Sequence, residues 1–361
     1  MVTYDAVVVG GSVAGSVTAR ELGLRGLRVA LLEKARHPRP KACGEGILPH
    51  GVAALSAMGL DYPGVRVKGL RYVSPGGIIA EVDFPFGEGM VVRREKFDAY
   101  LFDAAAGAPG VEAYPETPYD PDRWKARWVV GADGLHSQFH RKPPFRAKAP
   151  SEVRVGLSTH ATGLQVDRER VEVIFHEGVE VYLAPSDGEE VLVACLYRQD
   201  ALPKAPSNEL RVLHTLQNLE VLRDRIQGLT LTTPVLGAGP LGLTVSPVAT
   251  QDTLLVGDAA GATDPVTGEG MSMAMLSARC AAEAIVSGRP GDYEKEHRRL
   301  IGGAEWISSW VLRASRHPAI ADRVVGSLRN RPELFKKLIE VAIGSRLPAE
   351  MTLADLARLV M

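Results

Sequence analysis

Residues 4–15 read YDAVVVGGSVAG and join a run of apolar residues to a cluster of glycines. Val7, Val8 and Val9 form a β-branched run that is typical of a parallel strand covered on both faces. The following residues match the pattern G-x-G-x-x-G, with Ser12 in place of the middle glycine. Such a loop between a strand and a helix offers backbone N–H groups and a helix N-terminus to a pyrophosphate. Serine is small, so this departure still allows the backbone to approach a phosphate.

The residues after this loop complete a dinucleotide-binding unit. Residues 16–25 have helical composition, and residues 28–32 (RVALL) predict a second buried strand that ends at Glu33. An acidic side chain about 20 residues after the first glycine is where such units bind a ribose hydroxyl. We therefore expect Glu33 to bind the adenosine ribose; the plainer alternative is a solvated strand end.

Two stretches further along the chain point to FAD rather than to free NAD. VVGADG ends at Gly134, and LLVGDAAGATDPVTGEGM ends at Met271. Each begins with a run of apolar residues, as a buried strand does, and continues into a glycine-containing turn. The three stretches in this order predict an FAD-binding domain.

A second G-x-G-x-x-G occurs at residues 237–242 (GAGPLG). The residues after it, LTVSPVATQDTLLVGD, are rich in β-branched side chains and include Pro247. A dinucleotide loop needs a helix after it for its dipole and its N–H groups, and no amphipathic helix is predicted here. We therefore interpret this stretch as a loop between strands and not as an NADPH site.

Composition excludes several functional classes. The 361 residues carry a net charge of −1 and no long basic run, which argues against a nucleic-acid partner. Cys43, Cys195 and Cys280 are odd in number and far apart, so neither a disulfide framework nor a metal site is predicted. The chain enters a strand by residue 5, and it has no apolar run of roughly 18 residues that could span a bilayer. We expect a cytoplasmic protein, and peripheral membrane contact stays open.

The predicted elements divide the chain into interleaved parts. Alternating apolar residues with Gly and Pro turns predict antiparallel strands in two stretches, and strand–turn–helix patterns surround them. The predicted FAD-binding domain is discontinuous and comprises residues 1–64, 93–150 and 236–292. Residues 65–92 and 151–235 form the predicted substrate-binding sheet domain, and 293–361 a helical C-terminal region. The fold class is therefore α/β with an α+β second domain, in which a Rossmann-like FAD-binding domain is interleaved with an antiparallel-sheet domain.

The chain resembles the two-domain FAD-dependent oxidoreductases of the para-hydroxybenzoate hydroxylase fold, which are related to flavoprotein monooxygenases. Among them it is most similar to the geranylgeranyl reductase family. Besides the opening loop and Glu33, the resemblance is carried by KACGEGILP (41–49), VVRREKFDAYL (91–101), VVGADG (129–134) and GDAAGATDPVTGEG (257–270). The FAD motifs are specific for cofactor and fold, but one fold hosts many reactions.

The resemblance implies a role for each motif. Arg94 would bind FAD; the plainer alternative is a surface cation beside Arg93. Asp258 would accept hydrogen bonds from the ribityl chain, and Asp133 would buttress the cofactor. The N–H groups of Gly270 and Met271 would face the flavin, where a helix N-terminus stabilises the negative charge of the reduced ring. The residues expected to bind FAD are Gly10, Ser12, Val13, Ala14, Gly15, Glu33, Lys34, Ala42, Cys43, Arg94, Asp133, Gly257, Asp258, Gly268, Gly270 and Met271.

No catalytic residue is assigned from the sequence. Cys43 is a weak candidate, because it lies in the motif expected at the flavin; the plainer alternative is a small packing residue. The strands within residues 151–200 should line the substrate site, and they carry His160, His176 and Tyr182 as acid–base candidates. Met271 and its neighbouring methionines are interpreted as packing residues.

Three functions are weighed. The first is an FAD-dependent reductase or dehydrogenase of a small apolar organic substrate, polyprenyl- or quinone-like, by hydride transfer through flavin N5. NAD(P)H or another external donor would reduce the flavin. The second is a monooxygenase that hydroxylates or epoxidises a secondary metabolite through a C4a-peroxyflavin; a halogenase is a weaker variant, because the W-x-W-x-I-P signature is missing. The third is a non-enzymatic prenyl-protein escort, which the intact FAD motifs disfavour. Substrate, electron donor and oligomeric state are left open.

Overall fold

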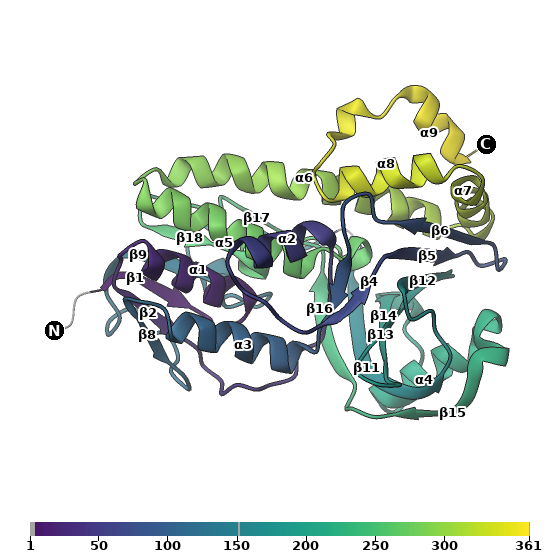
Figure 1. The fold of residues 1–361 in the computed structure, drawn as a ribbon, viewed down its shortest axis with the longest axis horizontal. Coiled ribbons are helices and arrows are strands. Elements are labelled where there is room, and N and C mark those ends of the chain that lie inside the picture. Colours follow the sequence, from purple (N-terminus) through teal and green to yellow (C-terminus); the bar gives the residue numbers. More distant parts are fainter. Residues whose placement is uncertain (1–3, 151, 361) are drawn as a thin grey trace.

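The structure is a computed structural model that describes residues 4–150 and 152–360. Two lobes, each built on its own large sheet, lie side by side along the long axis of the molecule (Figure 1). Helices from the C-terminal part of the chain lie over both lobes. The predicted α/β class with an α+β second domain is confirmed.

The first lobe contains a parallel sheet with β1 at its centre. Val7 and Val8 of β1 are fully buried, and the strand pairs with β2 on one side and β9 on the other. The β-branched run is therefore covered on both faces, as its composition predicts. The strand order is β18 (Thr253–Leu255), β9 (Ala126–Gly131), β1 (Tyr4–Val9), β2 (Val29–Leu32) and β8 (Val111–Tyr114).

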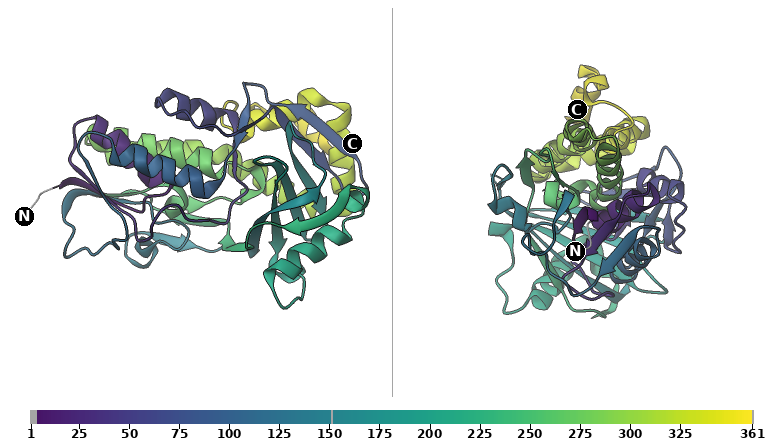
Figure 2. Two further views of the ribbon diagram at one scale, coloured as in Figure 1. Left: turned by 60° about the horizontal axis from the view of Figure 1, so that its bottom comes forward. Right: turned by 90° about the vertical axis from the view of Figure 1, so that its left-hand side faces the viewer.

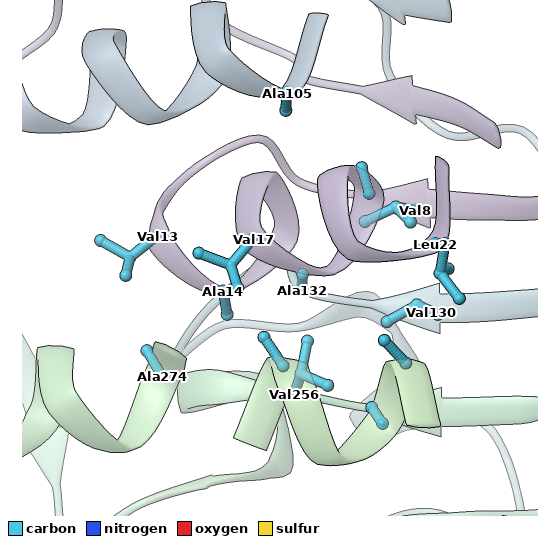
Figure 3. Packing of buried hydrophobic residues seen from close by; sticks show 14 of the residues in the cluster. Val8, Val13, Ala14, Val17, Leu22, Ala105, Val130, Ala132, Val256 and Ala274 are labelled. Carbon is cyan, nitrogen blue, oxygen red and sulfur yellow. The ribbon is translucent and has the colours of Figure 1, made fainter. Parts of the chain in front are cut away.

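Helices α1 (Val13–Leu24), α3 (Arg94–Ala106) and α5 (Gly270–Val286) lie over one face of this sheet, and α1 is in the middle (Figures 1 and 2). Small residues allow α1 and α5 to pack closely. Figure 3 shows Ala14 of α1 close to Ala274 of α5, with Val256 at the end of the neighbouring strand. The short helix α2 (Pro49–Ala57) also packs against α5.

The second lobe is a mainly antiparallel sheet, as the alternating stretches predict. Its one parallel pair among the described strands joins β12 to β5, a strand that precedes α3, β8 and β9 of the first lobe in the sequence. Its strands run in the order β15 (Ile226–Leu231), β11 (Arg154–Leu164), β14 (Val191–Arg198), β13 (Val179–Pro185), β12 (Arg170–His176), β5 (Gly69–Val73) and β6 (Ile79–Asp83), and β16 (Leu236–Leu241) also pairs with β11.

The second glycine-rich stretch forms part of this sheet. Residues 237–242 lie mostly in β16, and β17 (Leu243–Ser246) follows it with no helix between them. The interpretation of the stretch as a loop is therefore wrong, whereas the rejection of a dinucleotide site agrees with the structure. Pairing with β11 supplies the hydrogen bonds that fix these glycines in an extended strand. The predicted division of the chain at residue 236 assigns β16 to the other domain.

Two small sheets join the lobes. One contains β3 (Gly46–Ile47), β7 (Gly89–Val91) and β4 (Val65–Val67), so two of the strands predicted for the substrate sheet pair here instead. The other contains β10 (Arg146–Lys148), β17 and β19 (Gly261–Ala262). Both connect residues near the ends of the parallel strands to the second lobe.

Helices cover both faces of the second sheet (Figure 2). One face packs against α4 (Asn208–Asn218), and the other packs against α7 (Pro318–Asn330), α8 (Pro332–Ala342) and α9 (Leu353–Val360). Helix α6 (Pro290–Ser315) has 26 residues and contacts α5 and α8, so it connects the two lobes. No described helix is both long and apolar enough to cross a membrane.

Candidate active site

The glycine loop, residues 10–15, forms a cradle at the end of β1. Gly10 has a φ of 105°, and a Cβ atom there would overlap the backbone of Ala132. A Cβ atom at Gly15 would overlap the carbonyl oxygen of Gly10. Helix α1 begins at Val13, and the side chain of its N-cap residue Ser12 makes no capping hydrogen bond. The first N–H groups of α1 are thus left to a ligand, and the loop fits a pyrophosphate.

Glu33 lies beside this loop at the end of β2 and is only 2% exposed. Its carboxylate accepts hydrogen bonds from the N–H groups of Gly11 at 2.8 Å and Ala35 at 2.9 Å. These bonds fix the carboxylate and leave lone pairs that could accept from a ligand, and the expected contact with the adenosine ribose stays a prediction. The neighbouring Lys34 is exposed.

Arg94 is buried, which excludes the alternative of a surface cation. Its guanidinium donates to both carboxylate oxygens of Asp98 at 2.9 Å and to the hydroxyl of Ser12 at 3.1 Å. Ser12 in turn donates to Asp98 at 2.6 Å. Burial lowers the pKa of Arg94, but the charge of Asp98 outweighs burial and raises it overall. The fork of Arg94 therefore acts on the glycine loop through Ser12, and the expected direct contact with FAD stays a prediction.

The 41–49 segment contributes a cluster that the sequence analysis missed. Glu45 is buried with a φ of 54°, a conformation that side chains other than glycine rarely adopt. Its carboxylate accepts from the N–H group of Arg94 at 2.9 Å and lies 2.8 Å from Nε2 of His160 on β11. The N–H group of Cys43 donates to the hydroxyl of Ser158 at 3.1 Å. These bonds fasten the segment, with Cys43 and Ala42 in it, to the second sheet.

The 257–271 stretch packs against the glycine loop. Gly257 has a φ of 56°, and a Cβ atom there would lie 2.8 Å from Cβ of Ala14. Asp258 follows Gly257 and is partly buried. In the 129–134 motif, Oδ2 of Asp133 accepts from the N–H group of Gln138 at 2.9 Å, and its Oδ1 is buried with no partner among the described residues. An unpaired buried acceptor here fits a ligand that brings donors.

Two buried contacts from the second sheet hold the loop before α5. Arg154 of β11 donates to Asp264 at 2.6 Å and also pairs with Glu180. The phenol of Tyr182 on β13 donates to the carbonyl oxygen of Val266 at 2.8 Å. Asp264 also accepts from the N–H group of Val266 at 3.1 Å and so caps the turn that begins at Pro265. Gly268, Gly270 and Met271 are positioned by these anchors.

The predicted site residues are thus brought together from six stretches of the sequence: 10–15, 33–34, 42–43, 94, 133 and 257–271. They surround the ends of β1, β2, β9 and β18 and the N-termini of α1 and α5. Of the three acid–base candidates, His160 and Tyr182 are buried, but His176 is exposed at the end of β12. The contact of Glu45 with His160 and the burial of Glu269 were not predicted; each glutamate lies between two glycines, and this repeated G-E-G pattern is a signal that could have drawn attention to them.

An apolar cavity of about 360 Å³ lies between the second sheet and the C-terminal helices. Three aromatic rings form part of its wall: Tyr72 packs edge-to-face with Phe175, with ring centroids 5.2 Å apart, and at a tilt with Phe335, with centroids 4.7 Å apart. Leu48 of the 41–49 segment and Thr267 of the loop before α5 also line it. The cavity therefore extends from the C-terminal helices to the predicted flavin site.

Comparison with known proteins assigns the cofactor. Residues 110–288 match the FAD binding domain family model. The chain is 29% identical to a geranylgeranyl diphosphate reductase of Rhodobacter capsulatus over 336 residues, which cover 81% of each chain. The cofactor is FAD, and the predicted resemblance to geranylgeranyl reductases is confirmed.

Solved structures share the fold at lower identity. A geranylgeranyl bacteriochlorophyll reductase-like protein from Thermoplasma acidophilum has a TM-score of 0.73 and 20% identity, with 99% of this chain and 96% of that chain covered. A flavin-dependent brominase has a TM-score of 0.81 and 19% identity, with 99% and 97% covered. At these identities the likeness establishes the fold alone.

Proposed function

Since this chain is an FAD-dependent oxidoreductase, we propose that it reduces or dehydrogenates an apolar organic substrate of polyprenyl- or quinone-like character. The observation that carries this proposal is the apolar cavity, which ends at the loop before α5. Its volume of about 360 Å³ is in the range of pockets that enclose a small organic ligand. Such a cavity binds a ligand mainly by removing apolar surface from water.

The character of the cavity wall favours a hydrocarbon chain over a polar metabolite. Its walls carry aromatic and aliphatic side chains from the sheet and from α6, α7 and α8, including Leu70, Phe84, Ile307, Val325, Leu328 and Ile339. A polar substrate would lose hydrogen bonds to water there without replacement. The geranylgeranyl group in the relative's name is an apolar polyprenyl chain, and it supports the same substrate class.

Residues of this chain would hold FAD and fix its orientation in the site. When bound, FAD accepts or delivers a pair of electrons as hydride. The glycine loop would take the pyrophosphate, and Glu33 the adenosine ribose. The first turn of α5 would place N–H groups at the flavin, where a helix N-terminus favours negative charge. NAD(P)H or another external donor would supply the electrons.

The outer end of the cavity supports contact with a membrane surface. Trp310 lines the cavity and is 41% exposed, and on α9 Leu353 is 86% exposed. A tryptophan with one apolar side and one wet side suits a lipid–water interface. A polyprenyl substrate dissolved in lipid would reach the cavity from there.

Anaerobic reoxidation tests the proposal. The holoprotein is reduced chemically without oxygen and mixed with polyprenyl alkenes or quinones, and the flavin absorbance is followed. We expect one of these compounds to reoxidise the flavin. If oxygen alone reoxidises it and the organic product gains oxygen, the protein is a monooxygenase instead.

A cavity-filling variant connects this activity to the cavity. Ala321 of α7 lines the cavity and is 4% exposed, so Ala321→Phe should occupy the space of the substrate. We expect this variant to keep FAD and to lose reoxidation by the substrate. The matched control is Ala106→Phe at the exposed end of α3, which should react like the wild type. Equal loss in both variants would contradict a role for the cavity.

A further inference from the structure

We propose that Glu269 is the catalytic acid that donates a proton to the substrate. This inference rests on the proposed reduction of an apolar substrate and adds the proton source to it. Glu269 directly precedes α5 and follows Gly268, whose φ is 71°. It thus lies between the predicted flavin contacts Gly268 and Gly270.

Glu269 is buried next to the wall of the cavity. Thr267, two residues earlier, lines the cavity. Tyr72 lines it from the sheet side, and burial followed by the charge of Glu269 raises the pKa of that phenol to about 12. Glu269 therefore belongs to the predicted flavin loop and lies close to two residues that line the space for substrate, although it does not itself line that cavity.

The carboxyl group of Glu269 makes no hydrogen bond within the described part of the chain. The residue is 1% exposed, and neither carboxylate oxygen has a hydrogen-bond partner among the described residues. The side chain does not cap α5, although it stands at the N-cap position. The hydroxyl of Thr267 is likewise buried without a partner in the described part of the chain. Buried polar atoms are normally paired, so these groups fit a site that acts on a ligand.

The surroundings of Glu269 favour its protonated form. Two effects oppose each other, because the N-terminus of α5 favours a carboxylate whereas burial without partners disfavours it. Burial outweighs the helix and raises the pKa of Glu269 well above its ordinary value. A carboxylic acid that stays protonated near neutral pH is suited to general-acid catalysis.

Other titratable groups nearby are less suited to this role. Burial lowers the pKa of His50 to about 4, so its ring is neutral at pH 7. Nε2 of His160 and the carboxylate of Glu45 are hydrogen-bonded to each other at 2.8 Å, so each already has a partner. The phenol of Tyr182 donates a hydrogen bond to the carbonyl oxygen of Val266, and burial raises the pKa of this phenol well above its ordinary value.

The proton completes the chemistry of an alkene reduction. The π bond of the substrate breaks and two C–H bonds form, one with hydride from the reduced cofactor and one with the proton of Glu269. The substrate gains two electrons and two hydrogen atoms, and the cofactor is oxidised. Glu269 is left as a carboxylate and takes a new proton from water, and the external electron donor restores the cofactor.

The test compares Glu269→Gln with Glu333→Gln, an exposed glutamate on α8. In single turnovers without oxygen, we expect Glu269→Gln to slow substrate reduction about 10²–10⁴-fold and to leave substrate binding unchanged. Glu269→Asp should recover part of the rate, and the wild-type rate should fall as pH rises through the raised pKa. Glu333→Gln should match the wild type.

Two measurements independent of activity read the proton directly. The infrared band of a protonated carboxyl group should be present in the holoprotein at neutral pH and absent in Glu269→Gln. In addition, the folded-state pKa lies above the ordinary value of 4.5, so the wild type should lose stability relative to Glu269→Gln as pH rises above about 4.5. Both differences should be missing for Glu333→Gln.

The outcomes separate this inference from the proposed function. If the wild type reduces the substrate and Glu269→Gln is equally fast, or if the carboxyl band is missing, Glu269 is not the acid. If the wild type reduces no alkene or quinone while the band is present, the proposed function fails and the role of Glu269 fails with it.

Discussion

The glycine loop and the apolar cavity differ in how much space they contain. A single added methyl group at Gly15 would overlap the carbonyl oxygen of Gly10, whereas the cavity between the second sheet and the C-terminal helices has a volume of about 360 Å³. The glycine loop binds through backbone groups, so its geometry admits no side chain. The cavity binds through shape and apolar surface, so many side chains of similar volume could build it. This difference explains why the cofactor can be predicted from the sequence and the substrate cannot.

The largest expected effect is at the glycine loop. Gly15→Ala should abolish FAD binding or the folded protein, because the added Cβ would overlap the carbonyl group of Gly10, which directly follows β1 and cannot move without displacing that strand. The measurement is the ratio of flavin to protein absorbance after purification. Gly302→Ala in α6 is the matched control, since an added Cβ there meets nothing within 4 Å and should stabilise the helix by about 0.5–1 kcal/mol. A yellow Gly15→Ala protein would show that the loop tolerates side chains after all.

A smaller effect is expected at the buried ion pair that supports the loop. Arg94→Ala leaves Asp98 buried without its cation and should cost about 3–5 kcal/mol of unfolding free energy. Lys96→Ala is a control on the same helix, because Lys96 pairs with Asp187 at the surface and should cost at most about 1 kcal/mol. Denaturant titration of both variants measures the difference. Similar losses would mean that the network around Ser12 is not a special support of the cradle.

The smallest expected effect concerns His50, on α2 between the two regions. Its pKa is lowered from 6.5 to about 4 by burial, so protonation favours the unfolded chain. The contribution of His50 to stability should be complete above pH 6.5, and about 3 kcal/mol of it should be lost as pH drops through 4. The pKa of His297 is also lowered to about 4, so this residue should add a loss of similar size. His50→Gln should therefore remove about half of the combined loss of stability in acid. The control is His136→Gln at an exposed position, which should leave the loss of stability in acid unchanged. If His50→Gln also leaves it unchanged, the burial of the His50 ring is contradicted.

The features predicted from the sequence are those set by neighbouring residues. The strand before Gly10, the acid after β2 and the turn before α5 follow from local patterns of apolar and glycine residues. Long-range pairing is not visible in such patterns. The Glu45–His160 contact joins residues 115 positions apart, and the partner strand β11 makes β16 a strand in spite of its glycines. The unpaired carboxyl of Glu269 likewise depends on what surrounds it.

Product analysis tests the central claim most directly. The reduced holoprotein is mixed with a polyprenyl alkene without oxygen, and the mass of the organic product is measured. An FAD-dependent reductase should return a product heavier by two hydrogen atoms, and Ala321→Phe should return the substrate unchanged. A product that forms only when oxygen is admitted, and that has gained an oxygen atom, would contradict the account.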